Sequence, residues 1–133
     1  AKFSNKLQNT TNKLSKNSAK FKDTTMKKGK KTYTVQLTGL NKCIAKDKTF
    51  NTLYVDTNIK GKDKKKVTVT NVNVFFDGKK VKTIKKGVLT PDPGQTDGFV
   101  QLQIINMWNS RVAKFKYTMP KKTIKVTYTV KIK

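Results

Sequence analysis

The sequence predicts an all-β protein, an antiparallel β-sandwich of about seven strands, on the basis of three observations. From Thr32 onward apolar residues alternate with polar ones, which is the two-residue period of a half-buried strand. The alternating runs are rich in β-branched and aromatic residues. Gly, Pro, Asn and Asp separate these runs at intervals of roughly ten residues. Closure into a barrel is the less favoured alternative.

The chain has 133 residues, the length of one domain, and its first 31 residues differ from residues 32–133, which are expected to form the sandwich. This basic N-terminal segment is rich in Lys, Asn, Ser and Thr. Leu7, Leu14 and Phe21 are spaced by seven, which places them near one stripe of a helix. Asn and Thr are poor helix formers, and no Glu is present to pair with Lys. The segment is therefore expected to be either a weakly docked helix or a flexible leader.

Seven alternating runs are expected to be the strands of the sandwich. The last run is the clearest, because Ile124, Val126, Tyr128, Val130 and Ile132 share one face and alternate with Lys and Thr. The expected strands are residues 32–40, 50–59, 67–76, 81–84, 99–105, 111–119 and 124–132.

Turn-forming residues connect these runs. Residues 61–66 are expected to form a turn rich in Lys and Asp. Residues 90–98 contain two of the three Pro residues and are expected to form a loop. Asp77-Gly78 lies between two alternating runs, and this dipeptide predicts a tight hairpin because both residues tolerate a positive φ.

Two positions break the regular pattern. In the run 67–76 the alternation slips by one residue near Thr70 and Asn71. This slip indicates either a β-bulge or a strand that crosses from one sheet to the other. Trp108 falls in a turn between two runs. It either closes one end of the sandwich, which is the favoured interpretation, or stands exposed as a platform for a ligand.

The composition excludes most catalytic chemistry. The chain has 31 Lys and Arg residues against seven Asp, a formal net charge of +24, and neither His nor Glu. It therefore has no imidazole base, no imidazole metal ligand and no Glu for paired acid–base work. A nucleophilic Ser or Thr would need a buried Lys as its base, and no phosphate-binding Gly-x-x-x-x-Gly-Lys-Ser/Thr loop occurs. We expect a protein that is not an enzyme and requires no cofactor.

The Asp and Cys residues offer little further chemistry. Asp92 and Asp97 share one loop, but calcium needs about six to eight oxygen ligands and the positive charge of the chain opposes its binding. Turn formation is therefore the favoured role for these residues, and no metal site is expected. Cys43 is the only cysteine, which excludes an internal disulfide. We expect it to be a small half-buried residue.

Lysine clusters are the remaining candidate for a binding function. Clusters at one end of a sandwich can merge into one positive surface, which would bind polyanions mainly by counterion release. The alternative is a solvated lysine surface that keeps edge strands from pairing with other chains. Because Arg111 is the only Arg, sequence-specific reading of nucleic acid is not expected. The candidate polyanion-binding residues are Lys27, Lys28, Lys30, Lys31, Lys64, Lys65, Lys66, Lys79, Lys80, Lys85 and Lys86.

The hairpin region resembles a known class of module. The sequences VTVTNVNVFFDGKKVKTIKK at 67–86, TDG at 96–98 and FVQL at 99–102 resemble those of immunoglobulin-like modules in bacterial and archaeal secreted or surface adhesin-like proteins. The resemblance implies an immunoglobulin-like sandwich and a non-enzymatic extracellular domain, and it carries over no functional residues. The sequence departs from those modules in the Lys-rich segment 1–31, which has no counterpart there.

These observations predict a secreted or cell-surface module that binds an anionic polymer or surface, or serves as a structural or adhesion domain. The expected partners are a cell-wall or glycan polymer or acidic lipid headgroups. The chain begins at Ala1, which favours an exported protein, and no apolar stretch reaches the length of a transmembrane helix. The alternative is a nucleic-acid-binding protein that uses the lysine clusters without sequence specificity.

Overall fold

Antiparallel strands dominate the computed structural model, which describes residues 3–8, 20–22, 24–26, 29–40, 50–91, 98–112 and 114–132. A short 3₁₀ helix, η2 (Gly61–Lys66), precedes the sixth strand. The strands are β1 (Phe3–Gln8), β2 (Lys20–Lys22), β3 (Thr24–Met26), β4 (Gly29–Thr38), β5 (Thr52–Lys60), β6 (Val67–Phe76), β7 (Lys79–Lys86), β8 (Val88–Pro91), β9 (Phe99–Asn106) and β10 (Ile124–Ile132).

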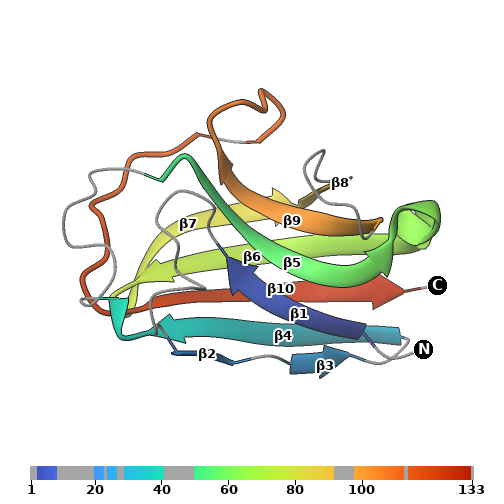
Figure 1. Cartoon of the computed structure of the whole chain (residues 1–133), viewed down its shortest axis with the longest axis horizontal. Helices are drawn as coiled ribbons and strands as arrows, with labels where there is room; N and C mark the ends of the chain where they lie inside the picture. Colours follow the sequence, from blue (N-terminus) through green and yellow to red (C-terminus); the bar gives the residue numbers. More distant parts are fainter. Residues whose placement is uncertain are drawn as a thin grey trace.

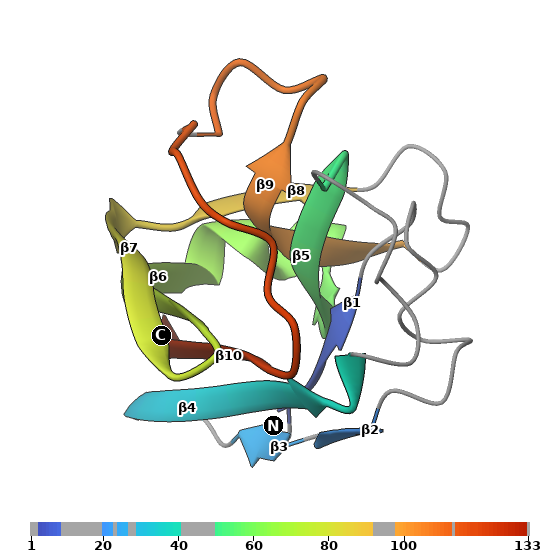
Figure 2. The ribbon, with the colours of Figure 1, turned by 90° about the vertical axis from the view of Figure 1, so that its left-hand side faces the viewer.

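These strands form two five-stranded sheets that face each other across one core (Figures 1 and 2). One sheet has the order β3-β1-β5-β9-β8 and the other has the order β2-β4-β10-β6-β7. The prediction of an all-β protein with two stacked antiparallel sheets is therefore confirmed.

Strand β10 lies between β4 and β6 and provides the most regular part of the core. Ile124, Val126, Tyr128 and Val130 are at most 1% exposed, while the residues between them lie on the outer face of the sheet. Apolar residues of β5 and β9 belong to the same buried cluster and complete it from the facing sheet. The predicted alternation of this strand is confirmed.

Strand β6 contains the irregularity that the slipped alternation predicts. Thr127 of β10 pairs with Asn73, but Thr129 pairs with Thr70, so β6 holds one extra residue between them. Asn71 adopts a φ of 52° at this point, in the left-handed region that Asn tolerates better than most residues. The slip is therefore a β-bulge within one sheet and not a crossing between sheets.

The described parts of the N-terminal segment are strands, not the helix considered for them. β1 pairs with β5, and β2 pairs with β4, so these backbone groups bond to the sheets. Leu7 and Phe21, two members of the expected helical stripe, lie on strands of different sheets, and Leu14 lies outside the described residues. A segment rich in Asn and Thr gains little as an isolated helix, whereas a sheet edge satisfies its backbone groups.

Residues 111–119, expected to form a strand, belong instead to a connection from β9 in one sheet to β10 in the other (Figure 2). Tyr117 and Met119 pack against the core, while Lys116 and Thr118, on either side of Tyr117, are exposed. The alternation therefore reflects one buried side of an extended connection rather than pairing in a sheet. The predicted turn at 61–66 is the 3₁₀ helix η2. Cys43, Asp92 and Asp97 lie outside the described residues.

A glycine allows the chain to change sheets between β7 and β8. The N–H of Gly87 donates a hydrogen bond to the Val69 carbonyl, with 2.8 Å between N and O. A Cβ on Gly87 would lie 2.6 Å from Leu102 Cδ1 and 3.1 Å from Val69 Cγ1. The backbone of Gly87 thus lies too close to the side chains of Leu102 and Val69 to carry a side chain of its own. The chain continues directly as β8, part of which occupies the loop expected at 90–98.

Gly87→Ala is expected to lower the free energy of unfolding by about 1–3 kcal/mol, because the new methyl group overpacks the core at Leu102. Gly61→Ala is the matched control, since its Cβ would meet only Gly98 O at an ordinary 3.5 Å. Its effect is expected to stay within about 0.5 kcal/mol. Urea unfolding followed by circular dichroism measures both variants, and equal stabilities would contradict the close contact at Gly87.

Candidate functional site

The candidate lysines lie in two groups toward opposite ends of the sandwich rather than in one cluster. Those near η2 and the start of β4 lie at one end, and those near the β6–β7 turn lie at the other (Figure 1). Lys85 and Lys86 lie toward the first end, because Lys86 pairs with Thr70 near the beginning of β6. Lys27 and Lys28 lie outside the described residues.

The first group, which we call the η2 end, combines three segments of the chain. Lys30 of β4 lies directly opposite Lys131 of β10, and neighbouring Ile132 pairs with Val67, the residue after η2. This end therefore carries a concentrated positive charge. Like charges directly across a strand pair repel each other. Consecutive lysines on a 3₁₀ helix leave it about 120° apart and face different directions. The η2 end comprises Lys30, Lys31, Lys62, Lys64, Lys65, Lys66 and Lys131, with Lys85 and Lys86 of β7 farther from η2.

The second group, which we call the connection end, is crossed by residues 107–123 between β9 and β10 (Figure 2). This connection begins at a projecting turn and finishes beside the β6–β7 hairpin. All of its cationic side chains in the described residues are exposed. The connection end comprises Lys79, Lys80, Arg111, Lys114, Lys116, Lys121 and Lys122.

Asp77 joins the two segments of the connection end. Asp77 and Gly78 have φ values of 53° and 84°, the positive pair of a tight hairpin turn, which confirms the predicted hairpin. The Asp77 carboxylate accepts hydrogen bonds from the backbone N–H groups of Lys121, Lys122 and Thr123 at 2.8, 2.7 and 3.0 Å. This clamp holds Lys121 and Lys122 beside the first residues of β7.

The outer face of the β4-β10-β6-β7 sheet separates the two ends. The hydroxyl groups of Thr32 and Thr129 lie 2.9 Å apart and share a hydrogen bond. Nearby, the Nζ of Lys125 lies 4.5 Å from the centroid of the Phe75 ring, a cation–π distance. These contacts engage a hydroxyl pair and one lysine of this face within the protein.

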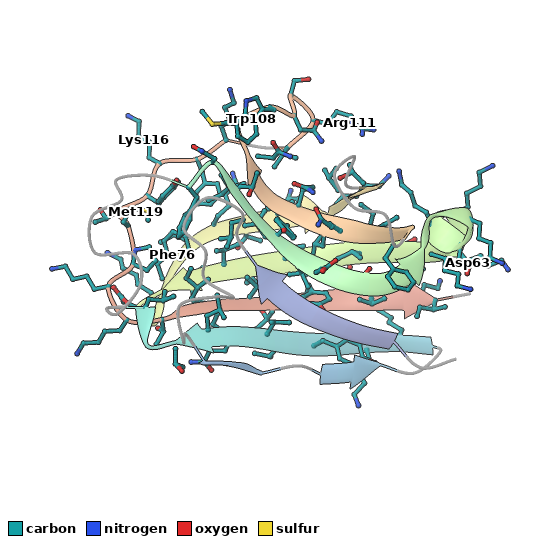
Figure 3. All side chains as sticks on the ribbon, viewed as in Figure 1. Asp63, Phe76, Trp108, Arg111, Lys116 and Met119 are labelled. Carbon is teal, nitrogen blue, oxygen red and sulfur yellow. The ribbon has the colours of Figure 1, made fainter. Side chains whose placement is uncertain are left out.

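Trp108 stands exposed at the start of the connection, so the favoured interpretation that it closes an end of the sandwich is wrong. It is 72% exposed and its neighbour Met107 is 54% exposed; they are the exposed large apolar residues of the described chain. Residues 106–112, which we call the tip, project beyond the sheets in both views of the ribbon (Figures 1 and 2). Trp108, Arg111 and Lys116 point away from the sheets on the same side (Figure 3).

Side-chain amides fix the conformation of the tip. The N–H of Trp108 donates to Asn106 Oδ1 at 3.0 Å, and the N–H of Arg111 donates to Asn109 Oδ1 at 3.0 Å. Asn106 in turn donates to Gln103 Oε1 at 3.1 Å, and Gln103 donates to Gln101 Oε1 at 3.0 Å. Both glutamines are buried. A continuous amide chain therefore connects the exposed tip to strand β9.

A pocket of about 280 Å³ opens beside the tip, and most of its lining is apolar. Tyr117 lies against Phe50, with ring centroids 6.0 Å apart, and its hydroxyl accepts a hydrogen bond from the Phe50 N–H at 2.8 Å. Lys114 is the charged residue of the lining. The lining residues are Phe50, Ile105, Asn106, Met107, Lys114, Phe115 and Tyr117.

Tyr128 is buried in the core, and its hydroxyl has no hydrogen-bond partner among the described residues. Burial, with a smaller contribution from Tyr33, raises the pKa of Tyr128 far above its ordinary value, so its phenol stays neutral. Across the described ranges, no group of three or more Cys or Asp side chains is placed to hold a metal ion. No helix in that part of the chain is suited to span a membrane.

Sequence reasoning identified Trp108 but missed Met107 beside it and the lysines that follow the tip. Met107, Lys114 and Lys116 attracted no prediction because they lie in a stretch assigned to a turn and a strand. The available signal was an adjacent apolar pair, Met107-Trp108, inside a turn bordered by Asn106 and Asn109. Asn at such positions bonds to nearby backbone and favours turns, so apolar residues between two of them are presented to solvent.

Asp77→Asn should destabilise the protein at neutral pH. Although partial desolvation opposes the effect, the three backbone N–H donors lower the pKa of the Asp77 carboxyl. A lowered pKa adds stability above the unfolded value of about 3.9, and that stability is lost as pH falls through the folded value. We expect a loss of about 1 kcal/mol at pH 7 for this exposed group, shrinking toward zero under acidic conditions.

Urea unfolding of the wild type and of Asp77→Asn, from pH 7 down to acidic pH, measures the difference in their free energies of unfolding. Asn tolerates the positive φ and retains one acceptor oxygen, so the substitution keeps the turn but removes the charge and one of the two oxygens that accept backbone hydrogen bonds. Asp63→Asn changes the net charge equally and is the control, with a smaller expected effect. A difference between wild type and Asp77→Asn that does not change with pH would contradict the clamp.

The chain was compared with protein families, curated proteins and solved structures. No family model, no curated protein and no solved structure matches it. The geometry of the two cationic ends and of the tip is therefore the basis for the functional conclusion.

Proposed function

We propose that this protein is a non-enzymatic, exported or surface-associated β-sandwich module that binds an anionic polymer or surface through its connection end. The observation that carries the proposal is the convergence of lysines from two segments distant in sequence. Asp77 holds Lys121 and Lys122 next to the turn from which Lys79 and Lys80 begin β7. Fixed cations from separate segments form a surface that a polyanion can contact at several points with release of its counterions.

The connection end suits this role better than the η2 end. Lys64, Lys65 and Lys66 are consecutive on a 3₁₀ helix, so one flat ligand cannot contact all three. At the connection end the cations are spread along an extended segment and a clamped turn, and Trp108 and Met107 add exposed apolar area at the start of that segment. A surface that offers both cationic and apolar groups binds a ligand through more kinds of contact than a surface with cationic groups alone.

The immunoglobulin-like class of the sandwich is part of this proposal. Strands β4–β10 divide four and three between the two sheets, which is the division found in constant-type immunoglobulin domains. The resemblance of the hairpin sequence to adhesin-like modules supports an extracellular setting.

Matched charge-neutralised variants test the proposal. The first replaces Lys79, Lys80, Lys121 and Lys122 by Gln, and the second replaces Lys62, Lys64, Lys65 and Lys66 by Gln. Binding to heparin is measured as a function of salt concentration. The first variant should lose affinity, and its slope of log affinity against log salt should fall by about one for each lysine that contacts the polymer. The second variant should change less.

Equal losses in the two variants would contradict a preferred surface. A duplex DNA of mixed sequence is measured in parallel at the same salt concentration. If DNA binds more tightly than heparin and through the same lysines, the protein is a nucleic-acid-binding protein instead. Circular dichroism of both variants confirms that the fold is retained.

A further inference from the structure

The tip presents an apolar surface in a place where water would normally favour polar residues. Met107 and Trp108 are adjacent and more than half exposed, whereas the other large apolar side chains whose burial is described, in residues 29–132, are buried or partly buried. Single exposed apolar residues are ordinary on protein surfaces, but an adjacent pair at the outermost point of a projecting turn is a feature of contact sites.

The tip holds its shape without a partner. Five hydrogen bonds fix its backbone or anchor it to neighbouring strands: those of the Trp108 and Arg111 N–H groups to Asn side chains, and three between backbone groups. The last three join Met107 N to Asn51 O at 3.0 Å, Asn109 N to Asn106 O at 3.2 Å, and Val112 N to Asn109 O at 3.2 Å. Buried Val112 anchors the far side of the turn. A preformed apolar tip loses little conformational entropy on binding.

Cations lie on the tip and directly after it in the chain. Arg111, Lys114 and Lys116 are exposed, and Arg111 and Lys116 point from the same side of the molecule as Trp108 (Figure 3). A projecting Trp flanked by cations suits the interface of an acidic bilayer. Trp favours the boundary between headgroups and acyl chains, and Lys and Arg reach back to the anionic headgroups.

A glycan fits the same site less well. Sugar sites are concave and orient their ligand with several polar side chains, whereas the tip projects beyond the sheets (Figures 1 and 2). In the pocket beside the tip, Tyr117 and Asn106 already take part in hydrogen bonds within the protein. Lys114 alone adds a charged group to that lining, so the pocket offers few groups to orient a sugar.

We propose that the tip inserts Trp108 and Met107 into the headgroup region of an acidic lipid membrane, with Arg111, Lys114 and Lys116 against the anionic headgroups. This inference rests on the proposed function and names acidic lipid as the anionic surface that the connection end binds. The tip projects to one side of the long axis of the sandwich, whereas η2 lies at one end of that axis (Figure 1).

Trp108 is the only tryptophan in the chain, so its fluorescence reports on the tip alone. The full-length protein is titrated with vesicles of phosphatidylcholine containing phosphatidylserine, with vesicles of phosphatidylcholine only, and with heparin. With the acidic vesicles we expect a blue shift of the emission and quenching by lipids brominated on their acyl chains. Heparin and neutral vesicles should produce neither change.

Sedimentation with acidic vesicles measures the effect of substitutions. Trp108→Ser should weaken vesicle binding about tenfold, because one partly inserted large apolar side chain is removed, and it should leave heparin binding unchanged. Trp108→Phe keeps an apolar ring and should retain most of the vesicle affinity. A triple variant replaces Arg111, Lys114 and Lys116 by Gln and should weaken vesicle binding. The control for charge is the variant of the η2 end, with Lys62, Lys64, Lys65 and Lys66 replaced by Gln, which should weaken vesicle binding less.

The outcomes separate this inference from the proposed function. Binding to heparin without binding to acidic vesicles, or vesicle binding without quenching of Trp108, overturns membrane insertion and leaves the proposed function in place. An equal loss of heparin binding in Trp108→Ser also overturns it, because the tip would then support the site only indirectly. If the wild type binds neither heparin nor acidic vesicles, the proposed function itself fails.

Discussion

The structure depends on the burial of one face of β10 against the opposite sheet. Every second residue from Ile124 to Val130 is removed from water, and each such large side chain contributes on the order of 1.5–3 kcal/mol. The free energy gained by this burial must exceed the free energy of repulsion among the charges of a chain with a net charge of +24. The repulsion is screened over about 8 Å at physiological salt, so an ordinary core is sufficient provided that the lysines stay on the outside.

Sequence patterns predicted the parts of the fold that local chemistry determines. The alternation of β10, the bulge at Asn71 and the Asp77-Gly78 turn all depend on side-chain period or on φ preferences of neighbouring residues. Residues 111–119 were mistaken for a strand because an extended segment with one buried side has the same period as a strand. The strands of the N-terminal segment depend on edges provided by β4 and β5, which no local pattern reveals.

The candidate site was predictable in composition but not in arrangement. Lysine clusters are visible in the sequence, yet their division between two ends follows from the pairing of β4, β6, β7 and β10. The clamp between Asp77 and Lys121 joins residues 44 positions apart and has no sequence signal. The exposure of Trp108 depends on amide groups that hold the turn outward. Charge alone therefore describes this protein poorly, since the two cationic ends differ in geometry and in apolar content.

Strand β7 lies at the edge of its sheet in the described residues, and five of its eight residues are lysines. An edge strand offers unpaired backbone groups to any other chain, and lysines oppose such pairing by repulsion. Neutralisation of those charges by a bound polyanion or by concentrated salt removes that protection. Solubility and ligand occupancy are then coupled, and a protein saturated with polymer becomes prone to edge-to-edge association between copies.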